Sequence, residues 1–368
     1  MRHFVFLIAI FVSLIPDLRA AEPFFKPNDV VALVGGEDMV VAAELGYLET
    51  LIQLALPDHH LKFRSLAREG DTVFEQRRDL NYPKLEDQLD KIGATVVICQ
   101  FGQMESLMAM GDAPKDKRDE KDAKDKKDAG KAEVPLVPSV PSVPEKADAT
   151  RKAKVAEFVV AYEKLIGRLS VGGKRRMVII SPTPIARART ATSNAEPDDR
   201  NATDFLDAIV ALADKQSIRF INTAHGLYVS LHTERGKDYY GLDGVHLTAN
   251  GQAFFATQVA ALAYAGQYGV DVPNRKTGEF GGVNPDGTNF VSKLAALRQL
   301  IAAKNRLWYY YYRPQNWAFL AGDRTNQPSS RDHLDPSKRW FPEELEKFVP
   351  LIDAKDAEIW ALAKKLSK

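Results

Sequence analysis

The amino-acid sequence predicts an α/β protein: a three-layer α/β/α sandwich with a five-stranded parallel sheet, followed by a helical C-terminal extension. Three observations lead to this fold class. Five short runs rich in Val and Ile are bounded by Gly, Pro, Asn or charged residues, as buried parallel strands are. Longer amphipathic segments separate the runs, which implies right-handed crossovers. A chain of 368 residues that is 45% hydrophobic is long and apolar enough for a large packed core.

The predicted strands and helices alternate along the chain. The strands are VVALV (30–34), LKFRSL (61–66), TVVIC (95–99), MVIIS (177–181) and IRFIN (218–222). The helices are expected near 40–56, 83–93, 154–170, 201–216 and 248–266. Thr248 has the side chain of an N-cap for the last of these helices. Cys99, the only cysteine, cannot form an internal disulfide and is expected to be a buried small hydrophobe.

The N-terminus has the pattern of a secretory signal. Arg2 and His3 precede the apolar run FVFLIAIFVSLI, and the small residues Ala20 and Ala21 follow. This run is too short to span a bilayer comfortably. We therefore expect residues 1–20 to be a signal peptide and the mature protein to be periplasmic or secreted, with no stable membrane span after cleavage.

A charged and proline-rich insert interrupts the alternation. Residues 112–153 contain DAPKDKRDEKDAKDKKDAGKAE and then VPLVPSVPSVPEK, which bury too little apolar surface to offset chain entropy. We expect this insert to be disordered and to lie within one domain, 21–270. Residues 271–368 form the predicted helical extension, with one helix around FVSKLAALRQLIAAKNRLWYYYY and a last helix beginning near Pro342. In the aromatic run from Trp308 to Tyr312, successive side chains point in different directions, so they cannot all be core.

Charge gives little reason to expect a macromolecular partner. The net charge of +1 does not favour nucleic acid.

Small polar and acidic groups gather where the predicted strands end, and ligands of open parallel sheets bind beyond these carboxyl ends. The segments at these ends are GGED (35–38), AREGDT (67–72), QFGQMES (100–106) and SPTPI (181–185), and LDGVHLTANG (242–251) comes before the last sandwich helix.

This last segment, read with the others, resembles the SGNH/GDSL hydrolases. Asp243 stands three residues before His246, as the aspartate and histidine of that family's triad do, and Gly70 follows the second strand as the family's glycine does. SPTPI and the LGYLETLI segment also lie where the family has similar sequence. The resemblance covers roughly residues 28–266 without the insert. It implies a flavodoxin-like SGNH hydrolase fold and an esterase or carbohydrate-ester deacylase activity.

Two family positions carry the wrong side chain for serine chemistry. On the family pattern, Glu37 stands where the nucleophilic serine should be, and Met104 takes the place of the oxyanion asparagine. Glu37 has no proton for His246 to remove at neutral pH, and the side chain of Met104 has no N–H to donate. Loss of one oxyanion donor typically costs about 10²- to 10³-fold in rate. A serine acyl-enzyme mechanism is therefore not expected.

Three interpretations of the site remain open at this stage. In the first, Glu37 acts as a general base on water and His246, held by Asp243, protonates the leaving group. The second is a non-catalytic extracytoplasmic protein that binds a glycan or another ligand. In the third, Glu37, Asp38, Asp243 and His246 hold a metal ion, although their spacing does not demand one.

A structural interpretation stands beside these three. Asp243 and His246 would cap the final helix, and Glu37 and Asp38 would be acids favoured by a helix N-terminus. We take Glu37, Asp243 and His246 as the candidate catalytic residues. Candidate oxyanion donors, including backbone groups, are Gly36, Gly70, Gly102, Gln103 and Met104. We expect no cofactor and no metal, and a small-molecule or glycan ester as the substrate or ligand.

Overall fold

The structure is a computed structural model that describes residues 23–76, 78, 82–111, 143–186, 200–231, 233, 238–264, 290–314 and 319–367. Its strands are β1 (Val30–Gly35), β2 (Lys62–Ser65), β3 (Val96–Gln100), β4 (Arg176–Ile180) and β5 (Arg219–Ile221). Its sandwich helices are α1 (Glu37–Leu45), α2 (Tyr47–Ala55), α3 (Leu85–Lys91), α4 (Gln103–Gly111), α6 (Val143–Ser170), α7 (Arg200–Lys215), α8 (Thr223–Leu231) and α9 (Ala249–Tyr264). The extension contains α10 (Phe290–Tyr312), α11 (Trp340–Glu346) and α12 (Phe348–Leu366), with 3-10 turns at Asp323–Asn326 and Pro328–Ser330.

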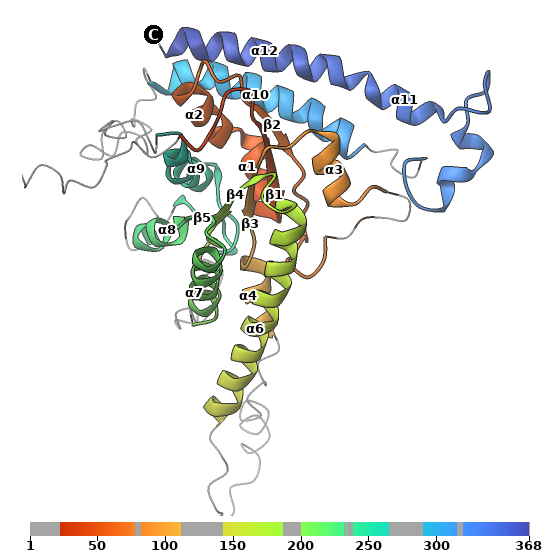
Figure 1. The fold of residues 1–368 in the computed structure, drawn as a ribbon. Coiled ribbons are helices and arrows are strands. Elements are labelled where there is room, and N and C mark those ends of the chain that lie inside the picture. Colours follow the sequence, from red (N-terminus) through yellow and green to blue (C-terminus); the bar gives the residue numbers. More distant parts are fainter. Residues whose placement is uncertain are drawn as a thin grey trace, which may run out of the picture.

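The five strands form one parallel sheet in the order β2-β1-β3-β4-β5, which confirms the predicted fold class. Every strand falls on a predicted apolar run. Because successive residues of a strand point to opposite faces, the sheet has two hydrophobic cores. Val31 and Leu33 of β1 face the core under α1, α2 and α9, whereas Ala32 and Val34 face the core under α3, α6 and α7. Figure 1 shows these two helical layers around the sheet.

The structure corrects the helix prediction at three places. The helix expected over 40–56 is two helices, because Gly46 adopts φ +73° and its N–H bonds to the carbonyl of Ala42. A Cβ at Gly46 would lie 3.0 Å from Cγ2 of Ile301, so α10 can pack closely here only against glycine. The short helices α4 and α8 were not predicted. Thr248 does cap α9 as expected, accepting a hydrogen bond from the N–H of Gly251 at 3.2 Å.

The predicted signal peptide, 1–20, lies outside the described residues, and so does most of the predicted insert. The structure begins α6 at Val143, so the end of the 112–153 segment is helical. Cys99 is fully buried, as expected, and burial raises the pKa of its thiol to about 12. This thiol is therefore not a nucleophile at neutral pH.

The extension docks along the sheet edge formed by β2. Helices α10 and α12 lie side by side over this edge (Figure 1). Three alternate carbonyls of the edge, those of Leu61, Phe63 and Ser65, accept hydrogen bonds from side chains of the extension. The donors, in the same order, are Trp360, Lys304 and Trp308 at 2.9, 3.2 and 2.6 Å. An open edge with unpaired backbone groups is thereby covered.

A buried ionic cluster joins the extension to the sandwich. Lys304 of α10 is completely buried, and its Nζ lies 2.7 and 2.8 Å from the two carboxylate oxygens of Glu49 in α2. Arg64 of β2 pairs with Asp356 of α12 at 2.6 Å, and Asp356 lies 3.9 Å from Lys304. Two acids and two bases therefore neutralise one another at the junction of three helices and the edge strand.

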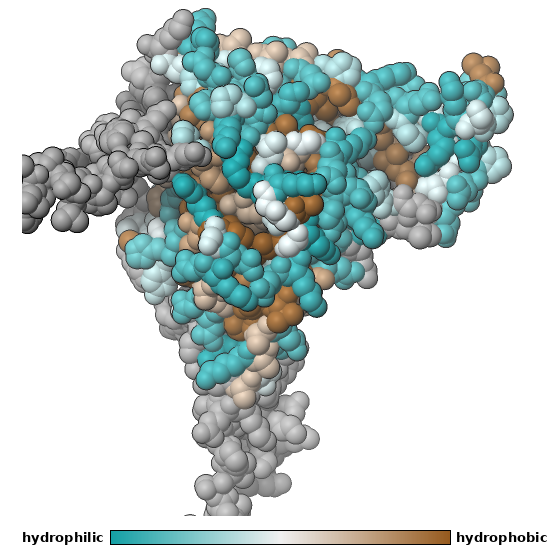
Figure 2. Space-filling model, viewed as in Figure 1, coloured by the Kyte–Doolittle hydropathy of each residue, from teal (hydrophilic) through white to brown (hydrophobic). Residues whose placement is uncertain are grey.

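The outer surface is mixed in character. Figure 2 shows hydrophilic residues over most of the viewed face, with small apolar areas between them instead of one continuous apolar patch. Of the helices in the described part of the chain, none combines the length and apolar content needed to span a bilayer.

Candidate active site

A small cavity lies beyond the carboxyl ends of β1 and β3, where ligands of parallel sheets bind. Its volume is about 90 Å³. It is lined by the loops after β1, β2 and β3 and by the segment before α9, so it brings together parts of the chain that are far apart in sequence. The residues lining it are Gly36, Glu37, Asp38, Gly70, Asp71, Gln100, Phe101, Gly102, Gln103, Met104, Glu105, Val245 and His246.

Glu37, His246 and Asp243 form a line at the mouth of this cavity. Nε2 of His246 lies 3.7 Å from Oε2 of Glu37, and Nδ1 on the other side of the ring bonds to Oδ2 of Asp243. The second carboxylate oxygen of Asp243 accepts the N–H groups of Val245 and His246 at 2.9 and 3.2 Å. The imidazole is thus held between two carboxylates, and all three side chains are about half exposed to solvent.

The two carboxylates stabilise the charged form of the imidazole. The hydrogen bond to Asp243, followed by the charges of Asp243, Glu37 and Asp38, raises the pKa of His246 above its ordinary value of 6.5. The same hydrogen bond, together with the two backbone N–H groups, lowers the pKa of Asp243 to about 2. His246 therefore keeps its proton to higher pH than an ordinary histidine and is suited to act as a general acid.

Of the described residues that line the cavity, none carries a hydroxyl or thiol group. Glu37 is the first residue of α1, and its N-cap Gly36 follows directly on β1. The turn is tight at Gly35, where φ is +151° and a Cβ would lie 2.5 Å from the carbonyl oxygen of Gln100. A glutamate carboxylate therefore occupies the place facing the histidine where a hydroxyl would begin serine catalysis.

Several candidate oxyanion donors are already paired. The N–H of Gly102 donates to the carboxylate of Glu105 at 2.9 Å. The side-chain amide of Gln103 donates to the carbonyls of Thr183 and Val245 at 3.3 and 3.1 Å, so it does not replace a missing asparagine in this arrangement. The thioether of Met104 lines the cavity without a donor. Gly36 and Gly70 remain as backbone positions in the cavity wall.

Asp38 is a buried residue of the cavity lining and is bound to the loop after β4. Thr183 donates its hydroxyl to Oδ2 of Asp38 and accepts the side-chain amide of Gln100 at 3.3 Å. Burial raises the pKa of Asp38 from 3.8 to about 6, while the Thr183 hydrogen bond and the charge of His246 oppose this shift. Thr183 has no role in the sequence-based prediction, although its place in SPTPI directly after a strand was a usable signal.

We expect Asp38→Asn to stabilise the fold at neutral pH. The raised pKa means that folded Asp38 holds a proton between about pH 4 and 6 where the unfolded chain does not, so the free energy of unfolding falls as pH rises through this window. A shift of about two pKa units corresponds to about 3 kcal/mol. The variant should gain about 1–3 kcal/mol at pH 7 and almost nothing at pH 4. Denaturant unfolding at both pH values measures this, with Glu44→Gln, an exposed acid on α1, as control. Equal gains at both pH values would contradict the prediction.

Asp71, which lines the cavity, forms a buried ion pair with Arg78 that was not predicted. Both side chains are about 95% buried, and two hydrogen bonds of 3.0 and 3.1 Å join them. Burial raises the pKa of Asp71, and the bonds and charge of Arg78 oppose this shift. The pair fixes the loop that carries Gly70.

Among the described residues, no group of three or more His, Cys, Asp or Glu side chains is placed to hold a metal ion.

The sandwich, its topology and the position of this cavity define the class of protein: the fold is SGNH hydrolase-like. The chain aligns with the structure of a gut microbial diltiazem-metabolizing enzyme at a TM-score of 0.53 and 11% identity, over 93% of this chain and 95% of that one. This likeness shows the fold alone, and it extends over nearly the full length of both chains.

Two other solved structures align over the sandwich. A GDSL-like lipase from Parabacteroides merdae aligns at a TM-score of 0.42 and 11% identity, over 66% of this chain and 98% of that one. An acetyl xylan esterase aligns at 0.42 and 16% identity, over 63% and 98%. No protein-family model matches the sequence, and no curated protein matches it.

Proposed function

We propose that this chain is an ester hydrolase with a rebuilt site, in which a carboxylate and an imidazolium act on water and on the leaving group. The carboxylate of Glu37 facing Nε2 of His246 at 3.7 Å, with Asp243 bound to the opposite ring nitrogen, is the observation that supports this proposal. The SGNH hydrolase-like fold agrees with it.

The proposed reaction needs no covalent intermediate. Glu37 accepts a proton from water as the water oxygen bonds to the ester carbonyl carbon. The resulting tetrahedral intermediate expels the alcohol, which takes the proton from Nε2 of His246. Glu37 then returns its proton to His246, so both groups are restored. Asp243 keeps the ring oriented and stabilises its positive charge.

The cavity size supports a short acyl group. A water molecule occupies about 30 Å³ in the liquid, so a space of about 90 Å³ has room for an acetyl group or a few waters. The backbone N–H groups of Glu37 and Gly70 are the donors we assign to the oxyanion. A donor at the first turn of α1 has the positive end of the helix dipole behind it.

Glu37→Gln and His246→Ala should each lower kcat/KM for acetyl esters by about 10²- to 10⁴-fold, the usual contribution of a general base or acid. Because the pKa of His246 is raised, turnover should persist above pH 6.5 and fall as pH rises through that pKa. Steady-state assays with acetyl and aryl esters measure both effects. His225→Ala removes an exposed histidine of α8 outside the cavity and should leave turnover unchanged. Turnover that survives both cavity substitutions would disprove the mechanism.

The second candidate is a non-catalytic protein that binds a glycan or another ligand in this crevice. The paired amide of Gln103 and the donor-free side chain of Met104 favour it, since both weaken an oxyanion site. It predicts no ester turnover, with saturable glycan binding that survives Glu37→Gln and His246→Ala.

We place the mature protein outside the cytoplasm, on the strength of the charged and apolar pattern in residues 1–20. Mass spectrometry of the protein isolated from its native host tests this proposal. A mature N-terminus near Ala21 supports it, and an intact N-terminal segment on protein from the cytoplasm contradicts it.

A further inference from the structure

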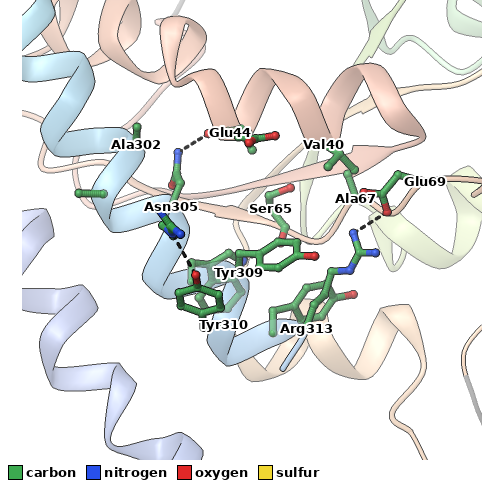
Figure 3. A pocket seen from close by; sticks show the side chains of 15 residues that line it. Val40, Glu44, Ser65, Ala67, Glu69, Ala302, Asn305, Tyr309, Tyr310 and Arg313 are labelled. Carbon is green, nitrogen blue, oxygen red and sulfur yellow. Dashed lines mark hydrogen bonds and ion pairs between the residues drawn. The ribbon is translucent and has the colours of Figure 1, made fainter. Parts of the chain in front are cut away.

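A second and much larger pocket lies beside the candidate active site. Its volume is about 700 Å³, within the range of about 300–1,000 Å³ that is usual for small-molecule sites. We refer to it as the α1–α10 groove, because α1 and α10 form its two long walls and the segment after β2 lies between them. Figure 3 shows Val40 and Glu44 on one wall and Tyr309, Tyr310 and Arg313 on the other.

The groove offers aromatic rings together with several small side chains. Tyr309 is 45% exposed and Tyr310 is half-buried, whereas Trp308 and Tyr312 of the same helix are buried against the sandwich. The small side chains of Ala43, Ala67, Ala302 and Ala303 leave space between these walls. Exposed tyrosine rings beside such small side chains can stack on a flat or slightly puckered ring of a ligand.

Polar groups surround these rings, and their charges balance. Arg313 lies 2.6 Å from Glu69, and its guanidinium lies over the ring of Tyr309 at 5.3 Å. Arg306 donates to the hydroxyl of Tyr310 at 3.0 Å, and Glu44 is an exposed carboxylate on the facing wall. Two arginines and two glutamates therefore give the groove no net charge, which favours a neutral ligand over an anion or a cation.

A ligand for this groove must bury one apolar face and satisfy many donors and acceptors at its rim. A purely aromatic ligand would desolvate the guanidinium, carboxylate and amide groups without pairing them, which is unfavourable. A sugar ring has an apolar C–H face and an edge of hydroxyl groups that act as donors and acceptors. We propose that the α1–α10 groove is a binding site for a neutral carbohydrate, stacked on Tyr309 and Tyr310.

The groove and the candidate catalytic cavity are lined by neighbouring residues of α1 and of the segment after β2, although no residue lines both. Glu37 lines the cavity, and Val40 and Glu44, three and seven positions later on the same face of α1, line the groove. In the segment after β2, Glu69 of the groove directly precedes Gly70 of the cavity. A carbohydrate in the groove can therefore direct an ester substituent toward Glu37. This last step rests on the proposed function, whereas the binding site itself does not.

Calorimetric titration with cellotriose, xylotriose and chitotriose tests the site. We use the unsubstituted full chain, because these oligosaccharides carry no ester group and are not substrates of the proposed reaction. Saturable binding of at least one of these probes is expected. Tyr309→Ala and Tyr310→Ala should each weaken it by about tenfold, as expected when a principal aromatic contact is truncated. Tyr228→Ala is the matched control, because Tyr228 on α8 is also 45% exposed and lies outside the groove.

The outcomes separate the groove from the catalytic proposal. Absence of binding by all three oligosaccharides, binding unaffected by both groove substitutions, or stronger binding of 2-naphthol than of any sugar would overturn the carbohydrate site. Ester turnover that depends on Glu37 and His246 can still be present in each of these cases. Conversely, sugar binding that depends on the two tyrosines stands even if no ester is cleaved.

Discussion

Replacing Lys304 with Ala should lower the free energy of unfolding by about 3–5 kcal/mol, the usual cost of breaking a buried ion pair by removing one partner. The ammonium of Lys304 is completely buried and neutralises Glu49. Burial raises the pKa of Glu49 above its ordinary value, and this lysine opposes the shift. Without it, Glu49 keeps a charge, or takes up a proton, in a place that water does not reach. The carbonyl of Phe63 loses a donor at the same time.

Urea unfolding of the variants measures this effect. Lys347→Ala removes an exposed lysine of the same extension and should change stability by less than about 0.5 kcal/mol. The double variant Glu49→Gln with Lys304→Met removes both charges and should recover at least half of the loss, because no unpaired charge remains. A Lys304→Ala variant as stable as Lys347→Ala would show that the buried cluster contributes nothing to stability.

Glu37→Ser should convert the protein from one that does not react with a fluorophosphonate into one that is labelled at residue 37. A serine at the first position of α1 would present a hydroxyl, on a shorter side chain, at the residue whose carboxylate now faces Nε2 of His246, and the dipole of α1 favours the alkoxide. Adding Met104→Asn should raise the labelling rate by a further 10²- to 10³-fold or so, the usual contribution of one oxyanion donor.

Intact-protein mass spectrometry and peptide mapping locate the label. Glu37→Ala and the double variant Glu37→Ser with His246→Ala should both remain unlabelled, since one lacks the hydroxyl and the other lacks the base. Robust labelling of the native protein at any residue of the cavity would overturn the assignment of Glu37 to the nucleophile position.

Much of the sandwich was predictable because buried parallel strands have a simple signature. VVALV and TVVIC are too apolar and too β-branched for a surface segment, and both are central strands here. Glycine was a weaker guide: Gly46 divides one predicted helix in two because it ends α1 in a left-handed conformation. Its packing partner in α10 is about 250 residues away in sequence. Short helices such as α8 have too few turns for a periodic pattern to identify them.

The candidate site was predictable in its membership more than in its hydrogen bonding. Glu37 was expected at the carboxyl end of the first strand, where ligands of parallel sheets bind, and the resemblance to the SGNH/GDSL hydrolases placed His246 beside it. The sequence does not reveal that the side-chain amide of Gln103 donates to the carbonyls of Thr183 and Val245, because those partners depend on how distant loops pack. The environment of Asp38 was hidden for the same reason, since its pKa depends on burial beneath the loop after β4.

The covered edge of β2 has a consequence for how this chain assembles during synthesis. Until α10 and α12 leave the ribosome, the carbonyls of Leu61, Phe63 and Ser65 lack the donors that the extension supplies, and the edge strand of a nascent sandwich is open to a strand of any neighbouring chain. The last part of the polypeptide thus protects the molecule from edge-to-edge aggregation through β2. Translation products that stop before residue 290 should form insoluble oligomers even though all five strands are present.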